Sequence, residues 1–198
     1  MTEMIDFGAQ TQLVAELAEN TAEEQLDAPT ACEGYAVRHL LGHLVGLTGA
    51  FRDAARKDIG PSTSTPPGSS LPDVTPGWRA DLDRNLAELA AAWRTPEAWD
   101  GETQAGGVPL PAAVAGRVAL NELVLHGWDL ARATGQAYAP EPADLGVSLA
   151  LLTSWAEESG GTPGAMFAAP VPVPADASLL DRVVALSGRR PDWTPAKP

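Results

Sequence analysis

Apolar residues recur at intervals of three and four along five stretches of this chain. That spacing places them on one face of an α-helix, so each stretch is predicted to be a helix with a buried side. The five predicted helices cover residues 5–20, 36–57, 75–93, 111–134 and 142–158. The fourth carries apolar residues around most of its circumference, so we expect it to lie at the centre with neighbours on several sides.

Residue types that favour helix ends support these boundaries. Thr75 and Pro76 suit an N-cap and a first helical position, which places the start of the third helix there. Gly135 suits the left-handed residue that ends the fourth helix. Gly160 and Gly161 are expected to end the fifth.

The connections contain few residues that could be buried. Residues 60–70 are rich in Pro, Ser and Thr and are expected to form a mobile surface loop. Residues 95–110 are expected to form a long crossover loop between the third and fourth helices. Prolines alternate along residues 171–174, which predicts an edge strand or an extended segment, and a short helix is expected over 178–187. The predicted fold class is therefore all-α, a four-helix bundle with a long crossover loop, plus a C-terminal extended segment and a short helix.

Length and charge restrict the classes of partner. The 198 residues are expected to form a single domain over 1–198, because domains commonly contain about 100–200 residues. Asp and Glu number 26 against 13 Lys and Arg, a formal net charge of −13 that repels phosphate backbones and anionic lipid surfaces. We therefore expect neither nucleic acid nor a membrane as partner. With no signal-like or bilayer-spanning segment, a cytoplasmic location is expected, and helix faces of this kind favour a homodimer.

The histidines are the first candidates for chemistry. The chain has three, His39, His43 and His126, and a single cysteine, Cys32, so a metal would have to be held by histidine and carboxylate. Glu122 and His126 are four residues apart and project about 40° apart on the helix, so both could bind one ion. An antiparallel neighbour could supply a third ligand from the second helix. Spacing alone leaves both His39 and His43 open for that role.

Two nitrogens and one carboxylate oxygen suit divalent zinc, nickel or iron, with positions left for water or substrate. The alternative is a salt bridge from Glu122 to Arg117 or Arg132. Asp129 lies one turn later and could orient His126 as a hydrogen-bond acceptor, although a solvated carboxylate near the helix end has the same pattern. The small side chains of Ala115, Val118 and Ala119 precede the pair and are expected to leave space for a substrate. An isolated cysteine such as Cys32 is more often a small buried apolar residue than a reactive thiol.

Three stretches together resemble the DinB-like superfamily, specifically the small metal-binding proteins related to the N-terminal domain of mycothiol-dependent maleylpyruvate isomerase. They are residues 31–46 (ACEGYAVRHLLGHLVG), 121–131 (NELVLHGWDLA) and 173–177 (VPADA). In that family a four-helix bundle with a long crossover holds a divalent metal, usually zinc, through a histidine on the second helix and a Glu-x-x-x-His pair on a later helix.

The resemblance implies that His43, Glu122 and His126 are the metal ligands. The family usually has an acidic residue at the position of His39 and Thr or Asp at that of Ala36, so His39 is a local departure that is expected to alter the pocket wall. The isomerase has an additional C-terminal domain, which this chain is expected to lack.

These features lead to competing functional hypotheses. The first is a metal-dependent enzyme acting on a small electrophilic metabolite, a transferase or isomerase in which the metal activates the thiolate of a mycothiol-type co-substrate. In a second version the metal activates water, which gives a hydrolase or lyase. The third is a bundle without catalytic activity that binds a metal or a small molecule, and the fourth is a bundle that has lost its metal and acts only as a dimerisation module.

Overall fold

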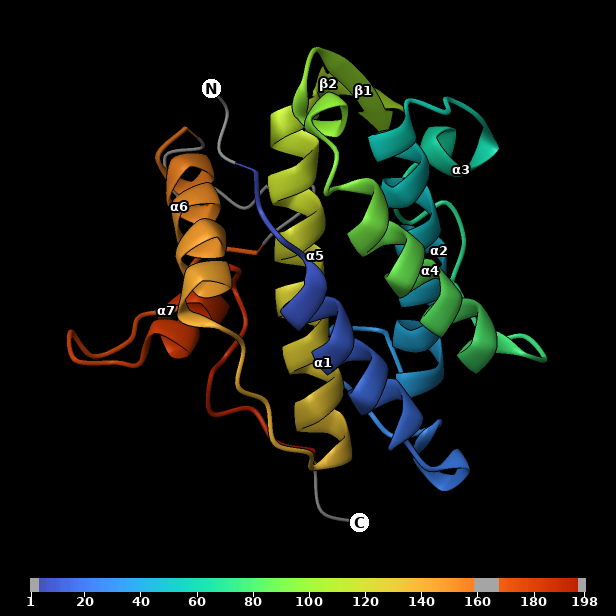
Figure 1. The fold of residues 1–198 in the computed structure, drawn as a ribbon. Coiled ribbons are helices and arrows are strands. Elements are labelled where there is room, and N and C mark those ends of the chain that lie inside the picture. Colours follow the sequence, from blue (N-terminus) through green and yellow to red (C-terminus); the bar gives the residue numbers. More distant parts are fainter. Residues whose placement is uncertain (1–3, 159–167, 196–198) are drawn as a thin grey trace.

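The structure is a computed structural model that describes residues 4–158 and 168–195, and these residues form a mostly helical fold (Figure 1). In chain order the elements are α1 (Gly8–Glu19), η1 (Glu23–Gln25), α2 (Val37–Arg56), α3 (Pro61–Ser64), α4 (Trp78–Ala92), η2 (Pro96–Trp99), β1 (Glu102–Ala105), β2 (Val108–Pro111), α5 (Ala112–Thr134), α6 (Pro142–Glu158) and α7 (Leu179–Leu186). None of the helices in these residues is long and apolar enough to cross a membrane.

The four-helix bundle consists of α1, α2, α4 and α5, and α5 lies at the centre of the fold. α2 packs on α4 and α5, and α1 packs on the same two helices from the other side. α6 covers a further side of α5, with α7 packed against α6 (Figure 1). Leu120, Leu123 and Val124 are all fully buried although they point in different directions from α5, which confirms the central position predicted from the sequence.

Large aromatic side chains close the core where α1, α4 and η2 meet. The ring of Phe7 stacks on that of Trp93, with 5.8 Å between the centroids, and Trp93 meets Trp99 edge to face at 4.9 Å. The indole nitrogen of Trp93 donates to the Phe51 carbonyl at 3.2 Å, so its polar group is satisfied inside the core.

The main helices begin and end close to the predicted positions, with two corrections: α1 begins at Gly8 and not at residue 5, and α4 begins three residues later than predicted. The correction at α4 has a clear cause. This helix begins at Trp78, and Thr75 does not cap it, because Gly77 has φ 87°, outside the helical region. Residues 75–77 instead form a turn in which the Trp78 N–H donates to the Thr75 carbonyl at 3.0 Å. Gly135 has φ 73° and ends α5 as predicted.

The connections contain more structure than the sequence indicated. Residues 60–70 include the one-turn helix α3, in which Thr63 is fully buried. The expected crossover loop contains η2 and an antiparallel hairpin of β1 and β2. Gly106 and Gly107, with φ 60° and 80°, form its two-residue turn, which needs positive φ at both positions.

The C-terminal predictions fare differently. Residues 171–174 form no strand, so of the two predicted alternatives the edge strand is excluded. The short helix α7 follows with Ser178 as its N-cap, and the Ser178 hydroxyl accepts from the Asp181 N–H at 3.1 Å. The predicted end of the fifth helix at Gly160 and Gly161 lies outside the described residues.

Candidate metal centre

Three of the predicted ligand residues converge between α2 and α5. The two helices pack together and run in opposite directions (Figure 1), so His43 on α2 faces Glu122 and His126 on α5. The Oε2 atom of Glu122 lies 3.2 Å from Nε2 of His126 and 3.6 Å from Nε2 of His43. One ligand atom from each residue lies within 4.8 Å of the others, as a shared ion would require.

Helix geometry explains this convergence. Glu122 and His126 are one turn apart on the same face of α5, so their side chains meet without distortion. His43 lies one residue before the fully buried Leu44, at the margin of the apolar face of α2. The rings of His43 and His126 meet edge to face, with 4.8 Å between centroids.

The site is partly open to solvent on one side. The side chains of His43 and Glu122 are 29% and 21% exposed, whereas that of His126 is 9% exposed. A small molecule could therefore approach Glu122 and His43 directly, while His126 forms the inner wall.

Glu122 and His126 stabilise each other's charged forms. Burial by itself would raise the pKa of Glu122, but hydrogen bonds and charge from His126 and His43 outweigh it and lower that pKa. Burial would likewise lower the pKa of His126, but Asp129 and Glu122 raise it to about 9. Neither Arg117 nor Arg132 forms a salt bridge with Glu122 within the described residues, since Arg117 is exposed and Arg132 donates to the Trp193 carbonyl at 2.9 Å.

Asp129 holds the other ring nitrogen of His126. Its Oδ2 lies 2.9 Å from Nδ1 of His126, and its side chain is fully buried. The solvated carboxylate that the sequence left open is therefore absent from this position. Arg189, which the sequence did not indicate, forms a two-bond ion pair with Asp129, with nitrogen-to-oxygen distances of 2.8 and 2.9 Å.

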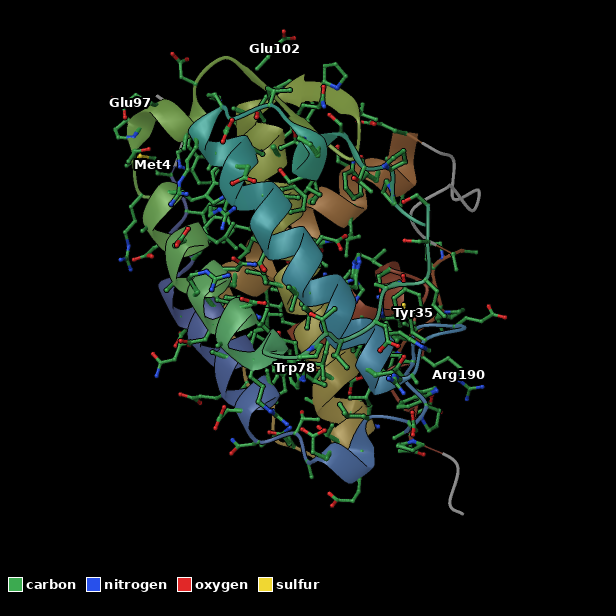
Figure 2. All side chains as sticks on the ribbon, turned by 90° about the vertical axis from the view of Figure 1, so that its right-hand side faces the viewer. Met4, Tyr35, Trp78, Glu97, Glu102 and Arg190 are labelled. Atoms are coloured by element: carbon green, nitrogen blue, oxygen red, sulfur yellow. The ribbon has the colours of Figure 1, made fainter. Side chains whose placement is uncertain are left out.

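His39 has a different role from His43. Its Nδ1 accepts a hydrogen bond from the Ala36 N–H at 3.1 Å, so it occupies the position of the acidic residue in a capping box at the start of α2. Tyr35, just before this helix (Figure 2), packs its ring edge-on against both His39 and His43, with centroids 6.2 and 6.1 Å apart. His39 thus acts as a helix cap and reaches His43 through Tyr35.

Within the described residues, the substrate space expected above the small side chains is absent. Ala115 and Ala119 are fully buried in the hydrophobic core and Val118 packs against it, so the two alanines line no solvent-accessible space. Their small size allows close packing between helices instead. The open side of the site lies at His43 and Glu122.

Cys32 lies near the inner side of the centre. Its Sγ is within 4.8 Å of ligand atoms of both His126 and Asp129. Burial, followed by the negative charge of Asp129, raises the pKa of this thiol to about 11, so it is protonated at neutral pH. No pattern in the sequence predicted this proximity, because Cys32 lies in a loop that is distant from α5 along the chain.

Comparison with known proteins identifies the same family that the motifs resemble. The family described as mycothiol maleylpyruvate isomerase N-terminal domain matches residues 7–131. Two curated proteins from two strains of Mycobacterium tuberculosis, both named as uncharacterized, are each 27% identical over 180 residues, which is 88% of this chain and 91% of theirs.

Solved structures share the fold. The crystal structure of the mycothiol-dependent maleylpyruvate isomerase is 20% identical, with a TM-score of 0.62, and the match covers 92% of this chain and 86% of that chain. A mutant of that isomerase is 21% identical with a TM-score of 0.61 and the same coverage. We expected the isomerase to have an additional domain that this chain lacks. The comparison does not support that expectation, because 86% of the isomerase chain is matched.

Proposed function

The chain belongs to the mycothiol maleylpyruvate isomerase N-terminal domain family, and on that premise we propose that it is a metal-dependent enzyme acting on a small electrophilic metabolite with a low-molecular-weight thiol. The reaction class is transfer or isomerisation. The observation that carries the proposal is the convergence of His43, Glu122 and His126. A mycothiol-type thiol is the proposed co-substrate because the solved structures that share this fold are named as mycothiol-dependent.

The donor atoms fit a divalent metal. Atoms bound tetrahedrally at the usual zinc distances are about 3.3 Å apart, and the two separations from Glu122 are 3.2 and 3.6 Å. Asp129 accepts from Nδ1–H of His126, so in the metal-free protein the protonated Nε2 donates to Glu122, and a bound ion would replace the proton on Nε2. We propose zinc, and nickel or iron would accept the same donors.

The charges of the site favour an anionic ligand. Arg189 balances Asp129, and Glu122 supplies one negative charge, so a divalent ion would leave one positive charge uncompensated. Such a site favours a thiolate over a neutral thiol. When bound, the ion would keep the sulfur of the co-substrate as its thiolate, the nucleophilic form, at neutral pH.

The remaining residues orient and shield. Asp129 fixes the ring of His126, and Tyr35 packs against the edge of His43 on the open side, where it would border an incoming substrate. The next residues along the two helices, Leu44 and Leu123, are fully buried in the hydrophobic core. The chain thus holds the thiol at one position and leaves the exposed side for the electrophile.

Metal content is the first test. Protein purified without chelators and without a nickel column is expected to contain about one zinc per chain by elemental analysis, and nickel or iron instead would change only the proposed metal. A chain that contains no metal and takes up none of the three when they are added would overturn the proposal.

Turnover is the second test, measured with a panel of electrophiles and low-molecular-weight thiols. Glu122→Ala is expected to abolish it, and Glu24→Ala, on the exposed surface, is expected to leave it unchanged. Thiol-independent hydrolysis or elimination would favour metal-activated water instead. If no substrate is turned over and Glu122→Ala only lowers the melting temperature, a binding protein without catalytic activity is favoured, and normal turnover by Glu122→Ala would contradict the proposed role of the centre.

A further inference from the structure

The end of α7 places one arginine against the inner side of the metal centre. Gly188 has φ 83°, its N–H donates to the Ala185 carbonyl at 3.0 Å, and the N–H of Arg189 donates to the Val184 carbonyl at 3.2 Å. These two bonds form a Schellman motif, which sets the direction in which the chain leaves the helix. A Cβ at position 188 would lie 2.6 Å from Ala168, so this turn also requires glycine for lack of space.

From this turn, Arg189 points back into the protein. Its Nε donates to Oδ1 of Asp129 at 2.8 Å and its Nη2 donates to Oδ2 at 2.9 Å, while Nη1 donates to the Ser187 hydroxyl at 3.1 Å. The side chain of Asp129 is fully buried and that of Arg189 is 13% exposed. A paired guanidinium fixes a carboxylate in position and in plane, and removing it would leave Asp129 as an uncompensated buried charge.

The same carboxylate orients the innermost ligand residue. Oδ2 of Asp129 accepts from both Arg189 and Nδ1 of His126, so the three side chains form one continuous series of hydrogen bonds. The orientation of the imidazole, and therefore of its Nε2 toward Glu122, depends on where Asp129 is held. Hydrogen-bond partners of this kind commonly alter metal affinity about 10–100-fold.

We propose that Arg189 is a positioning residue of the metal centre, through which the segment after α7 sets the orientation of His126 and the affinity for the ion. The proposal rests on the proposed metal site. It assigns a function to the C-terminal segment, which the match of the family to residues 7–131 does not reach. Arg189 acts through Asp129, and it has no role in chemistry at the substrate.

The test compares two adjacent arginines. Arg190 lies next in the chain but on the surface (Figure 2), where it pairs with Asp192 and both side chains are mostly exposed. Affinity for cobalt(II), measured from its visible absorption, and for zinc, measured by competition, is expected to fall about 10–100-fold in Arg189→Gln and to stay unchanged in Arg190→Gln. Arg189→Lys keeps the charge but loses the two-bond geometry, so an intermediate affinity is expected. Equal affinities in the wild-type protein and Arg189→Gln would overturn the proposal.

A second readout needs no metal. In the metal-free wild-type protein, the Nδ1–H proton of His126 should be protected from exchange and visible by nuclear magnetic resonance, and it should disappear in Arg189→Gln but persist in Arg190→Gln. If Arg189→Gln fails to fold, Arg189→Lys compared with Arg190→Lys provides the same test. A wild-type protein that binds no metal would contradict the proposed function, whereas a protected Nδ1–H in all Arg189 variants would contradict the positioning role alone.

Discussion

Asn121 offers a direct test of how the core beside the metal centre is packed. Its side chain is fully buried next to Glu122, and neither its amide nitrogen nor its oxygen has a hydrogen-bond partner within the described part of the chain. We predict that Asn121→Leu stabilises the protein, because leucine has a similar volume and brings no polar atoms into the core.

The magnitude follows from two contributions. Burying an amide without partners costs about 1–3 kcal/mol, and burying a leucine side chain contributes about 1.5–3 kcal/mol. Imperfect fit of the branched side chain offsets part of this, by about 1–3 kcal/mol. We expect a net gain of about 2 kcal/mol, which for a chain of this length raises the melting temperature by about 4–8 °C.

Asn85 is the matched control. It is also buried, but its amide nitrogen donates to the Val45 carbonyl at 3.1 Å and its oxygen accepts from Arg52 at 3.1 Å. Asn85→Leu is therefore expected to destabilise the protein by about 1–3 kcal/mol, since it leaves the Val45 carbonyl without this partner. Urea unfolding followed by circular dichroism measures both variants. A loss of stability in Asn121→Leu similar to that in Asn85→Leu would refute the reasoning and show that Asn121 has a polar partner in solution.

Three further predictions concern the titratable groups and the metal. Zinc at about 100 times its dissociation constant should stabilise the wild-type protein by about 2.7 kcal/mol, and calorimetry should show little shift in Glu122→Ala; equal shifts would place the ion elsewhere. Burial, with the negative charges of Glu141 and Asp6, raises the pKa of Asp144 from 3.8 to about 6. The folded protein therefore binds this proton more tightly than the unfolded chain, and the resulting stabilisation is complete below about pH 4 and is lost as the pH rises through 6. Asp144→Asn should therefore be more stable than the wild type at pH 7.5 by about 1 kcal/mol, after allowance for solvent screening, and no more stable at pH 3.5; a constant difference from pH 3.5 to 7.5 would contradict the shift. Iodoacetamide should alkylate Cys32 about a hundredfold more slowly in the folded protein than in urea, because its pKa of about 11 leaves little thiolate at pH 8, and equal rates would show an exposed thiolate.

Much of the helical framework can be read from apolar spacing alone. The predicted boundaries of the second and fourth helices differ from those of α2 and α5 by at most one residue. Lys57 and Gly135, which end these helices, follow apolar patterns that stop abruptly. The start of α4 was misplaced because Thr75 and Pro76 have the residue types of a helix start, whereas Gly77, with its left-handed backbone, delays it. The hairpin was not predicted because two consecutive glycines, Gly106 and Gly107, are compatible with a flexible loop as well as with a tight turn.

The candidate site also has one part that follows from the sequence and one part that does not. The pairing of Glu122 with His126 is local, since residues four apart on a helix are neighbours whatever surrounds them. The choice between His39 and His43 required a resemblance to known proteins, and the structure shows its physical basis, because His39 is engaged as the cap of α2.

Contacts between distant segments depend only on tertiary structure. Arg189 meets Asp129 across 60 residues of sequence, and Cys32 approaches His126 from a loop. The expected space above Ala115 is closed because neighbouring helices pack against it. The periodicity of apolar residues specifies which face of a helix is buried, but it does not specify what that face packs against. Which side chain fills a position, and which charged group pairs with a buried carboxylate, is decided only when the helices pack together.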